Sequence, residues 1–82
     1  MIRLRPEVLE ALREKGVEPQ ADDTAASLKE RLNEAYLVEV RRLRGRQRSG
    51  EIPLREYAAH AEALKESFPL LGLPLHRWEV SG

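Results

Sequence analysis

The sequence contains no cysteine, and this absence limits how so short a chain can be stabilised. A chain of 82 residues forms at most one small domain, whose core is marginal because it buries only about 60% of the surface exposed on unfolding. Small domains usually gain stability from disulfides, a metal or a partner chain. Disulfides and thiolate metal sites are excluded here, and the two histidines, His60 and His76, lack the spacing of metal ligands. The sequence therefore predicts no metal and no cofactor, and leaves self-association or close helix packing.

The sequence also lacks a net charge and a long apolar run. Its 14 basic and 14 acidic residues cancel, whereas a domain dedicated to nucleic acids is more often basic. No apolar run approaches the length that spans a bilayer, and the first ten residues lack the apolar core of a signal peptide. These features predict a cytoplasmic protein without a membrane partner. Most of the basic residues are arginine, which favours a GC-rich genome and a thermophilic source.

Motifs that carry catalysis are absent as well. There is no Gly-rich phosphate loop, no G-x-S-x-G, no H-E-x-x-H and no cysteine nucleophile. An enzyme of this size without metal ligands would be unusual. The chain is therefore predicted not to be an enzyme.

What the sequence does contain is a helical pattern in three stretches. Pro6 suits the first position of a helix over residues 6–15, which Gly16 ends. The longest pattern covers residues 25–46, with acids early and bases late, the order that the helix dipole favours. A third helix over residues 54–67 carries an apolar stripe and joins the second through a short turn, as in an αα-hairpin. We expect one all-α domain over residues 1–82.

The last twelve residues before Ser81 are more apolar than the rest of the chain. Two prolines and a glycine in residues 69–75 argue against a helix, so this stretch is predicted to be an extended tail packed over the helices. Residues 75–80 alternate enough for a short strand beside Ile2–Leu4. Trp78, the only tryptophan, either fixes this tail to the core or anchors a partner.

The segment Tyr36-Leu-Val-Glu-Val40 is too apolar for a helix with one buried stripe. On a helical projection Leu37 and Val38 lie off the face that the leucines of residues 25–46 define. Either the rest of the chain covers this second side, or the second side is an interface. We expect both, and predict a homodimer in which two hairpins form a four-helix bundle. The interface candidates are Tyr36, Leu37, Val38, Val40 and Trp78.

Two polar side chains project onto faces predicted to be buried, and both are candidate buried polar groups. Glu39 lies inside the apolar face of its helix, and His60 lies at the edge of the stripe on the next helix. A buried acid needs a charged or hydrogen-bonding partner, such as Arg42 or His60. The alternatives are a structural ion pair and a perturbed carboxylate in a pocket, and the structural ion pair is favoured because no other catalytic group is apparent.

The third feature is a run of arginines that ends the second predicted helix. An accessory nucleic-acid-binding protein is the alternative function, since clustered arginines contact phosphates. On a continuing helix, however, the cluster divides between two faces, and no aromatic residue offers a stacking platform. Bases at a helix C-terminus also have a structural explanation in the helix dipole. The candidate anion-binding residues are Arg41, Arg42, Arg44, Arg46 and Arg48.

Overall fold

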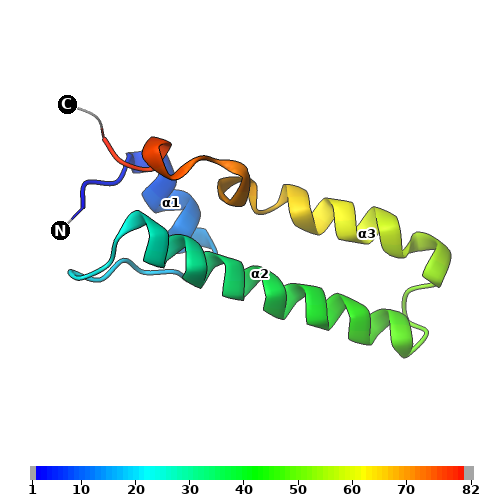
Figure 1. Ribbon diagram of the computed structural model, residues 1–82. Coiled ribbons are helices and arrows are strands. Elements are labelled where there is room, and N and C mark those ends of the chain that lie inside the picture. The colour runs from blue at the N-terminus through cyan, green and yellow to red at the C-terminus, as the bar shows by residue number, and fades with distance from the viewer. Residues whose placement is uncertain (1, 81–82) are drawn as a thin grey trace.

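The computed structural model describes residues 2–80, and most of them are helical, which confirms the all-α class. Three α-helices follow one another along the chain, and two short 3₁₀ helices come after them (Figure 1). Their bounds are α1 Pro6–Glu14, α2 Ala25–Arg48, α3 Leu54–Glu66, η1 Pro69–Gly72 and η2 Leu75–Arg77.

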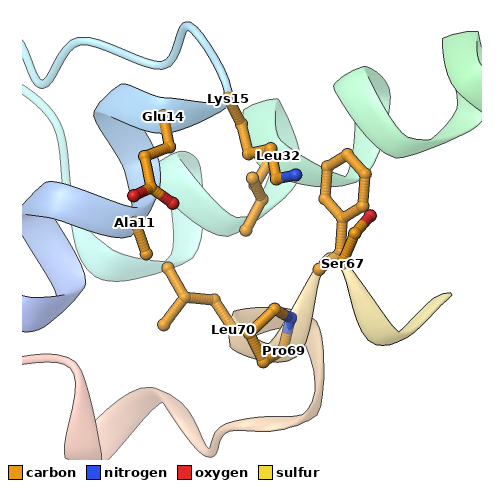
Figure 2. A pocket seen from close by; sticks show the side chains of 8 residues that line it. Ala11, Glu14, Lys15, Leu32, Ser67, Pro69 and Leu70 are labelled. Atoms are coloured by element: carbon orange, nitrogen blue, oxygen red, sulfur yellow. The ribbon is translucent and has the colours of Figure 1, made fainter. Parts of the chain in front are cut away.

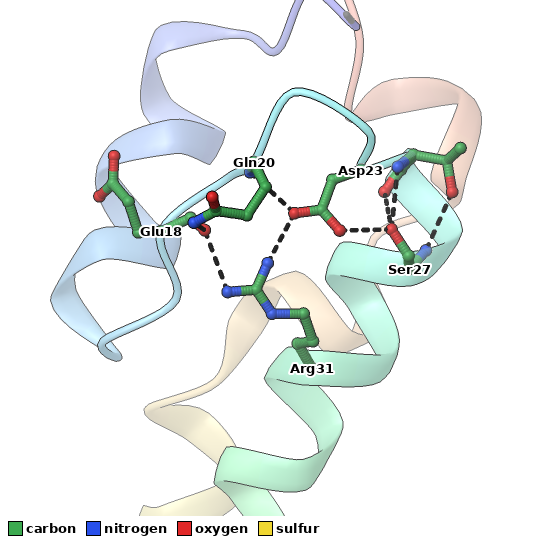
Figure 3. A network of polar contacts seen from close by, with 6 residues as sticks. Glu18, Gln20, Asp23, Ser27 and Arg31 are labelled. Atoms are coloured by element: carbon green, nitrogen blue, oxygen red, sulfur yellow. Dashed lines mark hydrogen bonds and ion pairs between the residues drawn. The ribbon is translucent and has the colours of Figure 1, made fainter.

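The loop between α1 and α2 is fixed by a polar network around Asp23 (Figure 3). The Asp23 carboxylate accepts hydrogen bonds from the backbone N–H of Gln20 at 2.8 Å, from the Ser27 hydroxyl at 2.7 Å and from the Arg31 guanidinium at 2.6 Å. Thr24 caps α2 through a capping box with Ser27, which satisfies two backbone N–H groups at the start of the helix. The start of α2 is therefore fixed by side chains that follow one another closely in the sequence.

The predicted end of the second helix, at residue 46, is two residues short. Helix α2 continues through Gly45 to Arg48, because a glycine inside a helix costs only about 1 kcal/mol relative to alanine. The chain then turns at Gly50, whose φ of +86° is a left-handed conformation that glycine adopts without strain. Ile52 is buried behind this turn and donates its backbone N–H to the carbonyl of Arg46 at 3.2 Å.

The hydrophobic core lies at the end of the molecule that holds α1, the start of α2 and both 3₁₀ helices. Trp78, with none of its surface exposed, belongs to a cluster with residues of α1, α2 and η1, and it donates its indole N–H to the carbonyl of Leu73 at 3.0 Å. The buried members of this cluster are Val8, Leu12, Val17, Ala25, Leu28, Leu32, Phe68, Leu70 and Trp78. We call residues 2–36 and 68–80 the core end.

The C-terminal segment is not the extended tail that its prolines predict. Pro69 stands in the first turn of η1, and Pro74 immediately precedes η2, positions at which the missing N–H of proline costs no hydrogen bond. Nor do the chain ends form strands within residues 2–80, where a single antiparallel bridge joins Leu4 to Glu79. Backbone hydrogen bonds from Arg5 to Trp78 and from Val80 to Arg3 flank that bridge and hold the two ends together.

The remainder of the molecule is an arm of two helices. The second half of α2 runs away from the core end, and α3 returns alongside it in the opposite direction (Figure 1). The molecule is consequently elongated, about 50 Å long and 19 by 16 Å across. We call residues 37–66 the arm.

Candidate interaction surface on the two-helix arm

The arm buries little of its own apolar surface. Leu43 and Ile52 are its buried hydrophobic residues, and α3 has no buried residue at all. Tyr57, Ala61 and Leu64 share one face of α3 at spacings of four and three residues, and they are only half-buried. Each helix of the arm packs on one neighbour, whereas the helices of the core end are covered from several directions.

The five interface candidates occupy three different environments. Tyr36 belongs to the core end, where its ring meets Phe68 edge-on with 5.3 Å between centroids. Leu37 and Val40 are half-buried on the arm, and Val38 is 43% exposed. Trp78 has no exposed surface, so of the two roles expected for it the structure shows the one inside its own core.

Leu54 is an apolar residue of the arm that the sequence places wrongly. The predicted stripe on the third helix includes Leu54, yet its side chain is 72% exposed. Leu54 is the first residue of α3 and lies at the tip of the arm, beyond the reach of the core end. Leu54 directly follows Pro53 and therefore lies at the start of a helix rather than within it. This position is the signal in the sequence that indicates the exposure of its side chain.

The arginine cluster separates into paired and unpaired members. Arg42 contacts the Glu39 carboxylate at 3.0 Å, and Arg46 contacts the Glu51 carboxylate at 2.5 Å. The other three, Arg41, Arg44 and Arg48, are exposed and make no ion pair with any residue from 2 to 80. The helix does bring these three to one face, at spacings of three and four residues.

The predicted burial of Glu39 and His60 is wrong. No polar or charged side chain among residues 2–80 is buried; Glu39 is 41% exposed in its ion pair with Arg42, and His60 is exposed. Both line a shallow hollow of about 180 Å³ between α2 and α3, beside Arg42 and Arg46. This hollow is smaller than most ligand pockets, which occupy ~300–1,000 Å³. The absence of an enzymatic activity stays a prediction.

A second cavity lies at the core end, between α1 and η1 (Figure 2). Leu32, Phe68 and Leu70 supply its apolar wall, and the Lys15 ammonium lies 4.5 Å from the centre of the Phe68 ring at its edge. The volume is only about 50 Å³. Such a space is too small for an organic ligand, so the cavity is a packing defect of the core.

The described residues contain neither a metal cluster nor a membrane-spanning element. No group of three or more His, Cys, Asp or Glu side chains between residues 2 and 80 is arranged to hold a metal ion. Within the same range, every helix is too short or too polar to cross a bilayer. The arm surface is therefore the strongest candidate for a functional site.

Comparison with known proteins finds no matching family model, no matching curated protein and no matching solved structure.

Proposed function

We propose that this chain is a small protein–protein interaction module that self-associates, as a homodimer, through the two-helix arm. The observation that supports the proposal is the contrast in burial between the two ends of the molecule. Helix α3 has no buried residue within a single chain, and the arm carries Leu54, Val38, Leu37 and Val40 at least partly in contact with solvent.

A second copy would supply the packing that the arm lacks. Isolated helices shorter than about 12–15 residues are marginal in water, and most helical stability comes from tertiary packing of an apolar face. Helix α3 has 13 residues and one helical neighbour. A second copy that packs along α2 would give the arm a further helical neighbour, as helices have in bundles.

The length of α2, half of which lies in the arm, agrees with a modest dimer interface. Helix α2 has 24 residues and is therefore about 36 Å long. A contact of that length across the 19 Å width of the molecule covers roughly 700 Å² per copy, close to the ~800 Å² of standard interfaces. An interface of this size without a large buried aromatic anchor predicts micromolar rather than nanomolar affinity.

Sedimentation equilibrium over a wide range of concentrations tests the proposal. We expect the weight-average mass to rise from that of the 9.4 kDa monomer towards twice that value within the micromolar range. A chain that stays monomeric at tens of micromolar would rule the proposal out.

A pair of substitutions locates the interface on α2. Leu37 and Val38 lie about 100° apart on the helix, so they face different directions. If the dimer uses the side of Leu37, then Leu37→Glu should weaken dimerisation and Val38→Glu should leave it unchanged. The reverse result places the interface on the side of Val38.

The unpaired arginines support nucleic-acid binding as a second candidate function. Arg41, Arg44 and Arg48 form an exposed basic stripe that three phosphates could contact. Fluorescence anisotropy with duplex DNA and RNA at low salt is the test. Binding that falls when Arg44 and Arg48 are replaced by alanine supports this function, and no binding excludes it.

A further inference from the structure

One face of α2 presents charges in an order that is complementary to itself. On a projection of 100° per residue, six residues fall within about 80° of one another. The acids come first, an apolar residue lies in the middle, and the bases follow. We call this set the outer face: Glu30, Glu34, Leu37, Arg41, Arg44 and Arg48.

The charges of the outer face have no partner within the described chain. All five are exposed, and none of them forms one of the ion pairs found among residues 2–80. By contrast, Arg31, Arg42 and Arg46 lie elsewhere around the same helix, and each is paired inside the chain. Apart from Lys29, the charges of α2 that form no ion pair among residues 2–80 are therefore gathered on a single face.

We propose that a second copy of this chain docks on the outer face, with the two α2 helices antiparallel and related by a two-fold axis near Leu37. Glu30 and Arg44 are each seven residues from Leu37, so this axis sets Glu30 of each copy opposite Arg44 of the other. Glu34 and Arg41 lie at nearly equal distances on either side, and they meet in the same way. The inference rests on the proposed self-association and specifies its geometry: each arm lies along the first half of α2 in the other copy, rather than against the other arm.

The alternative arrangement of two parallel helices is disfavoured by the same charges. In register, it would set Glu30 against Glu30 and Arg44 against Arg44 of the second copy. Like charges that face each other oppose association, whereas the antiparallel arrangement forms each attractive pair twice because the interface is symmetric.

The antiparallel arrangement also gives the exposed Leu54 a site on the second copy. Near the start of α2 a shallow apolar hollow is lined by Ala26, Lys29, Glu30, Asn33, Leu71 and Leu75. A two-fold axis at Leu37 maps residues 26–33 of one copy onto residues 41–48 of the other, the end of α2 beside which α3 begins. The tip of each arm would then cover the partly exposed Leu75 of the other copy.

A second copy fits the outer face better than a nucleic acid does. A duplex laid along the face would gain contacts at Arg41, Arg44 and Arg48 but would bring phosphates towards Glu30 and Glu34. The acidic half of the face opposes a polyanion, and it complements the basic half of another copy.

Two charge-reversed variants test the geometry. The first, Glu30→Arg with Glu34→Arg, makes the outer face entirely basic; the second, Arg41→Glu with Arg44→Glu, leaves Arg48 as its only base. Each variant alone should have a dimer dissociation constant at least about tenfold higher than that of the wild type. The reason is that the residues facing each other across the interface would then carry like charges. An equimolar mixture should form a heterodimer about as tight as the wild-type dimer, and analytical ultracentrifugation measures all three.

The control is Arg42→Glu with Arg46→Glu, which changes the net charge as much as the second variant does but on another face of α2. This control should dimerise like the wild type, and circular dichroism should show that all variants are folded. Variants that self-associate as tightly as the wild type, or a mixture that fails to recover the dimer, would overturn the proposed geometry while leaving self-association itself intact. If the wild type is monomeric and binds duplex DNA through the same arginines, the nucleic acid is the partner and the inference fails.

Discussion

The core end and the arm are built from similar amounts of helix but differ in how completely one chain can cover them. At the core end, α1, the first turns of α2 and η1 enclose Trp78, Leu12 and Leu28, which have no exposed surface. In the arm, two helices have only each other, and α3 buries nothing completely. The comparison teaches that the stability of this chain is concentrated at one end, and that its spare apolar surface is at the other.

The difference has a simple cause in the connectivity. The bridge between Leu4 and Glu79 brings the two chain ends together, so residues far apart in the sequence enclose the same core. Towards the tip of the arm, α2 and α3 have only each other alongside (Figure 1). The arm therefore depends on local contacts, which are the first to open when a protein fluctuates.

Substitution of Trp78 should have the largest effect on the free energy of unfolding. Trp78→Ala removes the largest fully buried side chain, and we expect it to lower the free energy of unfolding by about 3–5 kcal/mol. The matched substitution in the arm is Leu54→Ala, which removes a 72% exposed side chain and should change that free energy by less than about 0.5 kcal/mol. Urea denaturation at concentrations where the chain is monomeric measures both. Similar losses for the two variants would contradict the assignment of stability to the core end.

Two glycines of the arm should respond to the same substitution with opposite signs. Gly50 has a φ of +86°, and a Cβ there would meet no atom within 4 Å, so Gly50→Ala costs backbone strain alone, about 1 kcal/mol. Gly45 is helical and has equally open surroundings, so Gly45→Ala should stabilise α2 by about 0.5–1 kcal/mol. The midpoints of thermal unfolding should therefore move in opposite directions. A shift of the same sign for both would show that the turn at Gly50 differs from the one described.

Acid should weaken the core end through Asp23. The backbone N–H of Gln20, then the Ser27 hydroxyl and the Arg31 guanidinium hold the pKa of Asp23 below its ordinary value of 3.8. Because the pKa of Asp23 is lower in the folded state, the network contributes stability that is fully present above the ordinary pKa of Asp. This contribution is lost as the pH falls through the pKa of the folded state. The difference in unfolding free energy between wild type and Asp23→Asn should be largest at neutral pH and should shrink below about pH 4. Asp22→Asn, the same charge change at the neighbouring exposed position, should show a smaller effect, and a pH-independent difference for Asp23→Asn would contradict this role of the network.

The all-α class could be predicted from the sequence because helix periodicity and the dipole-ordered charges are local signals. The exposure of Glu39 could not be predicted in this way. A helical projection gives the direction of a side chain but does not show whether another segment covers that side chain. His60 and Leu54 are exposed for the same reason: α3 has one neighbour where the sequence pattern allows several. The 3₁₀ helices after Phe68 could not be predicted from the prolines. Proline is disfavoured inside an α-helix, but it is compatible with the first turn of a short helix.

The candidate surface was only partly predictable. The apolar excess at Leu37 and Val38 is visible in the sequence, and so is the division of the arginines between two faces. The pairing of Arg42 with Glu39 and of Arg46 with Glu51 is a property of the folded arm. These pairs distinguish Arg42 and Arg46 from the charges of the outer face, which form no ion pair among residues 2–80.

The central claim is that a second copy completes the arm, and hydrogen exchange of the α3 amides tests it most directly. At low micromolar concentration the amides of α3 should exchange much faster than those of the core end. Protection in α3 and along the outer face should rise with protein concentration, while protection around Trp78 should change little because that core is complete within one chain. Amides of α3 that are as protected as the core at every concentration would contradict the account.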